Sequence, residues 1–444
     1  MSPHEARLPA PALPEGALVD PIESRYRSLT PKSAAVQLRA TRVMPGGDTR
    51  SSVFHPPYSL TIARAAGSRV WDVDGNEYID LNNNYTALVH GHAYPPIVKA
   101  AREAMEHGST WSAKNLYQVE LAELIVDRIA SVDAVRFANS STEAALLALA
   151  IARAATGRRK ILMARWGFHG QHEAFNDAYF RGRQDPWPDT FVAEFGDAAT
   201  FAAVLEEHGD EIAAVFLEPI MGSAGVVTAP REFFTDVQAA CAKAGALFVL
   251  DEATVQRLSP GGCQAILDIQ PDLTMLGKVI GGGFLVGGVG GRLDVMDIVD
   301  ASRHVLNLSG TFAGNPVTMA AGIASVTDLT LERTRVMARH LAVIDRAIAA
   351  AAAEQGLRYS SRTAGSLLNV YFSETPPEAN QLRTDGEIVR AFHLAALTHG
   401  VFIAPRALIN TSSVLTEQDT QLATEKLRAA VADAAAAARP ASHG

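Results

Sequence analysis

Short apolar runs alternate with amphipathic segments along the chain from about His92 onward. The apolar runs predict buried strands, and the segments between them, which have helical periodicity, predict helices. The alternation predicts an α/β fold with a mostly parallel sheet that helices cover on both faces, and functional groups at the C-terminal strand ends. The predicted strands are Ala134–Ala138, Ile161–Ala164, Ala213–Glu218 and Ala246–Asp251, and the predicted helices are Pro95–His107, Gln118–Ile129, a run opened by Asn139 and ending at about Thr156, Ala199–His208 and Glu232–Ala244.

The two ends of the chain have a different pattern. Near the N-terminus, a helix from Ser33 to about Val43 precedes a small β-rich layer with strands at Leu60–Ala65, Arg69–Asp72 and Tyr78–Leu81. After about Asn315, two long helices are predicted at Pro316–Leu331 and Thr334–Gln355. Strands at Leu367–Phe372 and Val401–Ala404, with a helix at Gly386–Thr398, predict a small C-terminal α+β domain, which a final helix from about Thr416 to Ala437 closes. Residues 1 to about 22 are interpreted as a loose leader that orders against a partner subunit. The predicted division is 1–85 (N-terminal arm and part of the small domain), 86–325 (large domain) and 326–444 (C-terminal small domain).

Composition narrows the class of protein. At 444 residues the chain suits one large domain and a smaller one, and 48% apolar with 20% charged residues is ordinary for a globular protein. A formal charge of -9 gives no electrostatic basis for binding nucleic acid or an anionic membrane. Cys241 and Cys263 lack the CxxC spacing, and no apolar run is long enough to span a bilayer. We therefore expect a cytoplasmic protein with no metal site, no nucleic-acid partner and no membrane partner.

Lys278 has the most distinctive surroundings of the seven lysines. It follows the apolar residues Leu273, Met275 and Leu276 and precedes the triple glycine Gly281-Gly282-Gly283. Burial disfavours the ammonium and lowers the pKa of a lysine towards the range in which the amine is a nucleophile. The stretch suits a Schiff base with a carbonyl cofactor, and equally a lysine whose stem lies along apolar residues beside a glycine turn.

Two further stretches follow predicted strands and carry polar groups. Asn139-Ser140-Ser141-Thr142 opens a helix, where hydroxyls and free N–H groups form either an anion site or a simple N-cap completed by Glu143. Asp251 ends the most apolar strand of the chain. A carboxylate there is either the partner of a cationic ring nitrogen or a satisfied acid at the start of a turn.

An aromatic residue and a loop hydroxyl complete the set of candidates. Phe168, in Phe168-His169-Gly170, is placed either to stack on a flat cofactor or to pack in the core. Thr311 offers a hydroxyl in a loop just before Gly314-Asn315-Pro316. Together with Lys278, these stretches supply a phosphate cradle, a ring stack, an acid for a pyridinium and a Schiff-base lysine, which are the parts that pyridoxal 5'-phosphate (PLP) needs.

Nine stretches, in the same order along the chain, resemble the class III aminotransferases and cover most of residues 40–320. They are RVMPGG (42–47), VWDVDGNEYIDL (70–81), GHAYP (91–95), FANSSTEAA (137–145), GFHG (167–170), LEPIMGSAG (217–225), LDEA (250–253), PDLTMLGKVIGGG (271–283) and GTFAGNP (310–316). The resemblance implies a fold type I PLP-dependent transferase, with a large PLP-binding domain and a smaller α+β domain. It also implies a homodimer with active sites at the dimer interface.

The resemblance assigns roles to individual residues. Lys278 is implied to be the Schiff-base lysine and proton shuttle, Asp251 the partner of the pyridine nitrogen and Phe168 the ring stack. The full implied cofactor site consists of Ser140, Ser141, Thr142, Phe168, His169, Glu218, Asp251, Lys278 and, from the other subunit, Thr311. Ser141 stands where the family usually has glycine, Phe168 where tyrosine is more frequent, and Ala253 where a valine normally packs beneath the ring. None of these departures removes an essential group.

Two arginines bear on the substrate. Arg50, in Asp48-Thr49-Arg50, matches the carboxylate-binding arginine of glutamate-1-semialdehyde aminomutase and of the β-amino acid aminotransferases. Arg406 resembles a C-terminal arginine of the β-amino acid (β-phenylalanine) aminotransferases that accepts the carboxylate of the 2-oxo acid, and Tyr85 is expected to line the substrate pocket. A guanidinium suits a carboxylate through its bidentate fork, but either arginine could instead form a surface ion pair.

The expected reaction is transfer of an amino group from a β-amino acid to a 2-oxo acid such as pyruvate or 2-oxoglutarate. Two alternatives stay open. One is an isomerase similar to glutamate-1-semialdehyde 2,1-aminomutase, which needs no second substrate. The other is a D-phenylglycine-type aminotransferase, which shares Asp48-Thr49-Arg50. A dinucleotide site at the glycines after Lys278 is not supported, because the GxGxxG order, a preceding strand and a following acid are missing from the pattern.

Overall fold

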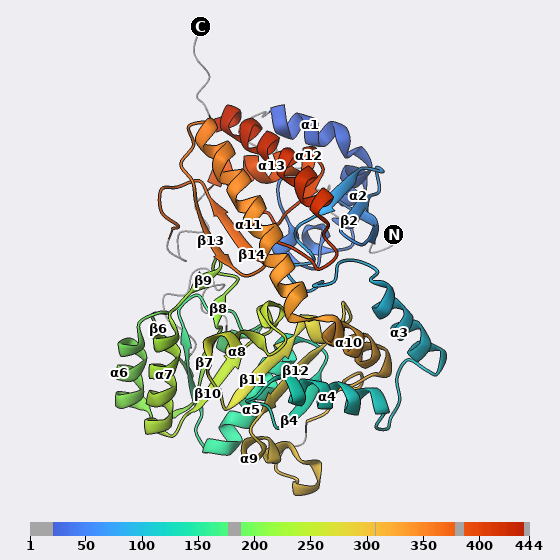
Figure 1. Cartoon of the computed structure of the whole chain (residues 1–444). Helices are drawn as coiled ribbons and strands as arrows, with labels where there is room; N and C mark the ends of the chain where they lie inside the picture. The colour runs from blue at the N-terminus through green and yellow to red at the C-terminus, as the bar shows by residue number, and fades with distance from the viewer. Residues whose placement is uncertain (1–20, 176–187, 307, 378–385, 439–444) are drawn as a thin grey trace, which may run out of the picture. The chain divides into compact units, whose positions relative to one another are not determined.

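The computed structural model of the chain describes residues 21–175, 188–306, 308–377 and 386–438 (Figure 1). The chain forms two compact units. Unit 1 takes in Met1–Tyr85, Arg339–Arg362 and Leu367–Gly444, and unit 2 takes in Thr86–Ala338 and Thr363–Ser366. Most of the predicted leader lies outside the described residues.

A seven-stranded sheet forms the centre of unit 2 (Figure 1). Its strands, in spatial order, are β4 (Ala134–Ala138), β12 (Gly287–Gly291), β11 (Leu273–Gly277), β10 (Leu247–Asp251), β7 (Ile212–Leu217), β5 (Lys160–Ala164) and β6 (Thr190–Ala193). Only β12 is antiparallel to its neighbours in this sheet, so β4 and β11 run in the same direction. The predicted mostly parallel α/β sheet is confirmed, and every strand of it except β12 ends at the same edge.

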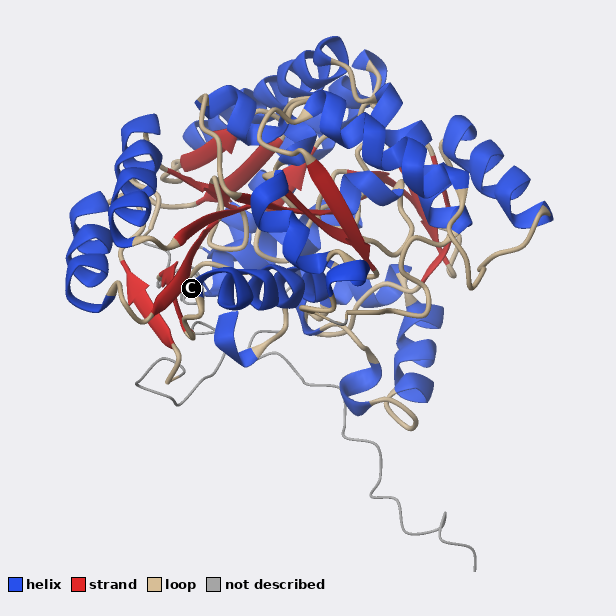
Figure 2. Ribbon diagram, turned by 90° about the horizontal axis from the view of Figure 1, so that it is seen from below, coloured by secondary structure: helices blue, strands red, loops and turns tan. Residues whose placement is uncertain are grey.

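Helices cover both faces of this sheet (Figure 2). On one face, α5 (Ser141–Thr156) shares a hydrophobic cluster with Met275. On the other face, α4 (Leu116–Arg128) and α10 (Pro316–Asp328) share a cluster with Leu276. Neighbouring residues of β11 therefore face opposite helical layers, as the alternation of side chains along a strand requires.

The remaining elements of unit 2 surround this sandwich. Its other helices are α3 (Pro95–Glu106), α6 (Ala198–His208), α7 (Arg231–Ala244), α8 (Gly262–Leu267), α9 (Leu293–Met296) and the first part of α11 (Leu331–Glu354). A two-stranded sheet pairs β8 (Ile220–Met221) with β9 (Val227–Thr228), and the 3-10 turns include η4 (Gln256–Leu258) and η5 (Lys278–Gly281). The helices that the apolar periodicity predicts in this part of the chain are present close to their expected bounds.

The glycine-rich stretch around Lys278 contains two strands that the sequence pattern does not predict. The expectation that no strand precedes the glycines is wrong, because β11 leads directly into Lys278. The strand β12 is the run GGVGG, and glycine is a poor strand former. Its glycines have a packing reason, since a Cβ at Gly287 would overlap the carbonyl of Ser140. A side chain at position 287 would therefore prevent the start of α5 from lying so close to the sheet.

Unit 1 joins the two ends of the chain. One sheet has the order β1 (Ile62–Ala66), β2 (Arg69–Asp72), β3 (Glu77–Asp80) and β15 (Val401–Phe402), and another has the order β13 (Ser360–Ala364), β14 (Leu367–Tyr371) and β16 (Leu408–Asn410). Its helices are α1 (Pro21–Leu29), α2 (Pro31–Ala40), α12 (Gly386–Thr398), α13 (Glu417–Ala438) and the rest of α11. Because β15 pairs in parallel with β3, an N-terminal strand and a C-terminal strand belong to one sheet.

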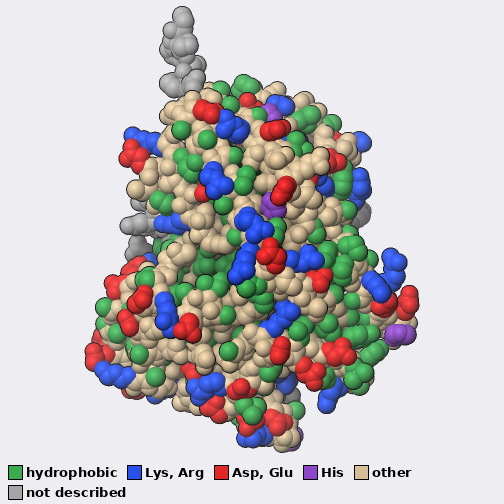
Figure 3. Space-filling view, in the orientation of Figure 1, with side chains coloured by type: hydrophobic (Ala, Val, Ile, Leu, Met, Phe, Trp, Pro, Cys, Tyr) green, Lys and Arg blue, Asp and Glu red, His purple; other side chains and the backbone are tan. Residues whose placement is uncertain are grey.

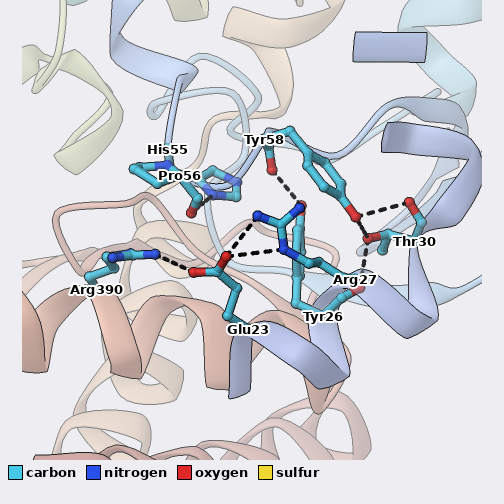
Figure 4. A network of polar contacts seen from close by, with 8 residues as sticks. All are labelled: Glu23, Tyr26, Arg27, Thr30, His55, Pro56, Tyr58 and Arg390. Carbon is cyan, nitrogen blue, oxygen red and sulfur yellow. Dashed lines mark hydrogen bonds and ion pairs between the residues drawn. The ribbon is translucent and has the colours of Figure 1, made fainter. Parts of the chain in front are cut away.

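The helix α1 is fastened by polar contacts that the sequence does not reveal (Figure 4). Glu23 accepts hydrogen bonds from Arg27 within the helix and from Arg390 of α12. The hydroxyl of Tyr26 donates to the carbonyl of Tyr58 at 2.8 Å. Glu23 and Tyr26 are both buried. The helix begins at Pro21, so the predicted leader is slightly too long at its C-terminal end.

The surface carries charges of both signs. On the face that Figure 3 shows, Lys and Arg side chains are interspersed with Asp and Glu and with apolar side chains. None of the helices in the described part of the chain combines the length and the apolar character that crossing a membrane requires.

Candidate active site

The candidate residues of unit 2 lie at the edge of the sheet where the parallel strands end. Asp251 is the last residue of β10, Lys278 follows β11 and Glu218 follows β7. Ser140 comes two residues after β4, and Phe168 comes shortly after β5. The carboxyl ends of the strands in an open α/β sheet are the usual place for a ligand, because loops and helix N-termini meet there.

Lys278 leaves the end of β11 in an unusual backbone conformation. Its φ is +47°, in the left-handed region that residues with a Cβ rarely adopt. The side chain is half-buried, and its Nζ donates a hydrogen bond of 2.8 Å to Oγ1 of Thr254. Such local strain is concentrated at functional sites, where the surrounding structure holds it in place.

Asp251 is buried and makes two hydrogen bonds within the protein. Its Oδ1 accepts from the backbone N–H of Ala253 at 3.0 Å, and its Oδ2 lies 3.0 Å from Nδ1 of His169. His169 is buried too, and its Nε2 has no hydrogen-bond partner among the described residues. A carboxylate has about four acceptor positions, so Asp251 retains capacity for one more donor such as a ring N–H.

Glu218 holds the loop that carries Phe168. Its Oε2 accepts from the backbone N–H of Phe168 at 3.0 Å, and its Oε1 accepts from that of Gly222 at 3.3 Å. Burial raises the pKa of Glu218 to about 7. The ring of Phe168 is half-buried. Glu218 therefore holds the backbone of Phe168 in place, and part of the Phe168 ring stays accessible to a ligand.

The start of α5 forms the N-cap that the sequence allows. Oγ of Ser140 accepts from the backbone N–H of Glu143 at 3.1 Å, and the Glu143 carboxylate accepts from Asn139. Oγ1 of Thr142 accepts from the backbone N–H of Gln171 at 3.1 Å. Such a cap satisfies only part of the first turn, since the first four N–H groups of an α-helix have no partner in the helix itself. The cap and an anion site are therefore compatible here.

Ser141 connects this helix start with the lysine turn. A Cβ built on Gly277 would overlap Oγ of Ser141 and would lie 3.4 Å from Cβ of Ala253. The extra side chain of Ser141 is accommodated because residue 277 is glycine. The helix start, the turn after Asp251 and the turn at Lys278 thus form one contiguous cluster.

The loop that carries Thr311 is held at both ends within the same chain. Arg136 of β4 donates to the carbonyls of Val299 and Leu308 before it, and Asn115 donates to the carbonyl of Gly314 after it at 2.7 Å. Thr311 itself is exposed. A Cβ on the neighbouring Gly310 would lie 3.1 Å from Nδ2 of Asn139, which places the loop beside the start of α5.

The substrate candidates Arg50, Tyr85 and Arg406 form a second group, within unit 1. The guanidinium carbons of Arg50 and Arg406 lie 5.5 Å and 5.6 Å from the centroid of the Tyr85 ring, within cation–π range. Arg50 also donates to Oδ1 of Asn84 at 2.6 Å, and the Tyr85 hydroxyl donates to the carbonyl of Ser52.

A left-handed turn presents Tyr85. Asn83, Asn84, Tyr85 and Thr86 have φ values of 46°, 49°, 52° and 76°. Each such residue with a Cβ costs roughly 1–2 kcal/mol, although asparagine tolerates the conformation better than most. The turn is supported by side-chain hydrogen bonds, because the backbone N–H of Tyr85 donates to Oδ1 of Asn82 at 2.9 Å. Sequence reasoning names Tyr85 but misses this turn, for which three consecutive asparagines are the available signal.

Thr254, which accepts a hydrogen bond from Lys278, is a further residue that the sequence does not single out. It is the third residue after Asp251, and β10 pairs in parallel with β11 so that Asp251 lies opposite Met275. This register brings the residues after Asp251 beside those that lead to Lys278. In the sequence, a hydroxyl three residues after Asp251 is only a weak sign of a contact with Lys278, since the sequence does not show which strand lies beside β10.

Comparisons with known proteins agree on one family. A family model described as "Aminotransferase class-III" matches residues 51–431. The beta-phenylalanine transaminase of Variovorax paradoxus is 37% identical, over 91% of this chain and 94% of that protein. A crystal structure of a beta-phenylalanine aminotransferase from the same organism matches with a TM-score of 0.85 and 36% identity, over 91% of this chain and 95% of that one. A glutamate-1-semialdehyde 2,1-aminomutase of Thermodesulfovibrio yellowstonii is 34% identical, over 85% of this chain and 92% of that protein.

Proposed function

The chain belongs to the class III aminotransferases, which are PLP-dependent transaminases, and from this premise we propose that it transfers the amino group of a β-amino acid to a 2-oxo acid. The observation that carries the proposal is the pair of arginines that both lie within cation–π range of the Tyr85 ring. Two guanidinium groups suit two substrates that each carry a carboxylate and bind in turn. The likeness to a beta-phenylalanine transaminase supports a β-amino acid as the donor.

The residues of unit 2 fit PLP. The start of α5 offers N–H groups and hydroxyls to a phosphate, and Asp251 offers a carboxylate to a ring N–H. Phe168 offers a half-buried ring face, and Lys278 offers an amine to the cofactor aldehyde. The start of α5 lies beside the lysine turn, since a Cβ at Gly277 would overlap Ser141, and this supports the proposal that both contact one cofactor. When bound, the cofactor supplies the electron sink that stabilises a carbanion at the substrate carbon.

The chain's own groups then have separate tasks. Lys278 would take the proton from the amine-bearing carbon of the substrate and deliver it to the cofactor carbon that accepts the amino group. Asp251 holds a positive charge on the ring nitrogen, and His169 keeps the Asp251 carboxylate oriented through its Nδ1 contact. Glu218 keeps the backbone of Phe168 in place through its hydrogen bond.

We test the proposal by incubating the purified protein with β-phenylalanine and 2-oxoglutarate, which should give glutamate. Substitution of Arg50 or Arg406 by methionine should raise KM for one substrate by about 10- to 100-fold, because a hydrogen-bonded ion pair is lost. We expect Arg50→Met to act mainly on the β-amino acid and Arg406→Met mainly on the 2-oxo acid. Arg64→Met is the matched control, since Arg64 is exposed like Arg50 and also lies over an aromatic ring, but this ring is that of Trp71.

The outcomes of this assay separate the candidate functions. No turnover with any β-amino donor would exclude the proposed reaction. Product formation from a single amino substrate without any 2-oxo acid would favour the isomerase alternative, to which the 34% identity with an aminomutase gives some support. Equal KM values for the wild type and both arginine variants would show that neither arginine binds a substrate.

We further propose that the protein acts as a homodimer, with Thr311 contributing to the cofactor site of the partner subunit. The support lies in exposed apolar side chains near the Thr311 loop. Leu116 at the start of α4 is 76% exposed, and the adjacent Asn115 binds the carbonyl of Gly314 at the end of the loop. Phe312 is exposed as well. The mass in solution, measured by light scattering, is expected to be twice that of one 47.2 kDa chain, and a monomer at micromolar concentration would contradict the proposal.

A further inference from the structure

The hydrogen bond between Lys278 and Thr254 joins two turns that follow neighbouring strands. Nζ of Lys278 donates to Oγ1 of Thr254 at 2.8 Å, and both side chains are half-buried. Thr254 follows β10 and Lys278 follows β11, so the contact lies at the edge of the sheet where β10 ends with Asp251. The hydroxyl therefore lies at the reactive end of the lysine, not along its stem.

The orientation of Thr254 is fixed by packing against a glycine. A Cβ built on Gly222 would lie 2.9 Å from Cγ2 of Thr254, so the methyl group of the threonine occupies the space above this glycine. Threonine has two heavy atoms on Cβ, and fixing one of them fixes the other. The backbone N–H of Gly222 in turn donates to Glu218 at 3.3 Å. The direction of Oγ1 towards Lys278 is thus set by the surrounding structure.

A hydroxyl suits both protonation states of a lysine. It can accept a hydrogen bond from an ammonium, and by rotating about the C–O bond it can donate to the lone pair of a neutral amine. A carboxylate in the same place would strongly favour the ammonium and slow its return to the neutral amine. The contact seen here can persist while the amine gains and loses a proton.

We propose that Thr254 is a positioning residue for Lys278, which holds the amine at the cofactor edge of the sheet whenever the amine is not covalently bound to the cofactor. The proposal rests on the transaminase function proposed above. In the proton-transfer step, the C–H bond at the amine-bearing carbon breaks, its electron pair stays with the substrate, and the proton forms an N–H bond at Nζ. Thr254 keeps its own proton throughout and limits where Nζ can move.

Three variants of the full chain test this proposal. Thr254→Val keeps the shape and the methyl group and removes the hydroxyl, whereas Thr254→Ser keeps the hydroxyl. Thr235→Val is the matched control, because Thr235 is also half-buried but its hydroxyl bonds within α7, to the carbonyl of Glu232. Thermal unfolding of each variant checks that the fold is retained.

We expect Thr254→Val to lower kcat by about 10- to 100-fold with KM changed by less than about threefold, since the lost hydrogen bond orients a reacting group and does not bind substrate. The kinetic isotope effect with a donor deuterated at its amine-bearing carbon should increase, because proton transfer becomes more rate-limiting. Cofactor-free protein given PLP should also regain its visible absorbance more slowly. Thr254→Ser should restore most of all three properties, and Thr235→Val should match the wild type.

Each other outcome overturns the inference or its premise. If Thr254→Val turns over and regains absorbance like the wild type, the hydroxyl does not position the lysine. If the valine and serine variants are equally impaired, packing of the methyl group against Gly222 explains the effect. If the wild type itself shows no transamination, the proposed function fails, and the rate at which absorbance returns still reports on the Thr254 contact.

Discussion

Replacement of Lys278 by alanine is expected to lower the rate of transamination by about 10³-fold or more, because it removes the residue that we propose as both nucleophile and proton-transfer group. The visible absorbance that depends on a covalent link between this lysine and the cofactor should disappear as well. Absorption spectra of the purified protein, before and after addition of PLP, measure the second effect independently of turnover. Alanine preserves the left-handed backbone at this position no worse than lysine, since both carry a Cβ.

Lys243 provides the control for this substitution. It lies on α7 and forms an exposed ion pair with Glu206, so Lys243→Ala should leave the spectrum and the rate as in the wild type. A Lys278→Ala variant that keeps the visible band unchanged would contradict the assignment. Loss of activity in the Lys243 variant would show instead that the assay responds to lysines without regard to position.

Much of the large sheet is predictable because its strands are short, apolar and separated by clear helices. The strand Ala134–Ala138 and the helix Gly386–Thr398 have the predicted bounds. The strand β12 is not predictable in this way, since GGVGG has no strand propensity and its place is set by the close approach of Ser140 to Gly287. Tertiary contact therefore decides the structure where local preference is weak.

The start of α5 shows why sequence alone leaves two interpretations open. The motif Ser140-x-x-Glu143 has the residue types of a capping box, and the structure contains a cap formed by both side chains. The same helix start adjoins the turns of Lys278 and Asp251, which the sequence places more than 100 residues away. The cap is a local property and is visible in the motif. That the start of α5 lies beside the turns of Lys278 and Asp251 depends on the order of the strands in the sheet, which the motif does not contain.

The two arginines proposed to bind substrate illustrate the same limit at longer range. Arg50 and Arg406 are far apart in sequence, and each alone resembles an ordinary surface arginine. The pairing of β15 with β3 brings a C-terminal segment beside the strand that precedes Tyr85. Family resemblance names the residues, but only the fold brings both guanidinium groups within cation–π range of one tyrosine ring. Their roles in binding stay predictions.

The second large effect is expected for Asp251→Asn, which should lower kcat by about 10²- to 10³-fold while the cofactor remains bound. Asparagine has nearly the same shape as aspartate but carries no charge, so it cannot stabilise a positive ring nitrogen. The local hydrogen bonds can survive the change. The amide oxygen can accept from the N–H of Ala253, and the amide NH₂ can donate to Nδ1 of His169 if that ring carries its proton on Nε2.

Because the packing is retained, the loss of activity in Asp251→Asn should occur without a large loss of thermal stability, and this distinguishes an electrostatic role from a structural one. The variant should still show the visible absorbance that depends on Lys278, with the position of the band changed by the altered ring charge. Asp294→Asn is the control, since Asp294 pairs with Arg292 on the surface and should not affect turnover. If Asp251→Asn retains turnover within about twofold of the wild type, the charge of Asp251 is not needed for the reaction. Its carboxylate would then serve only to hold the turn through the hydrogen bond from the N–H of Ala253. The electron sink would then have to be sustained without a charged partner, which is the less effective arrangement for stabilising a carbanion on this ring.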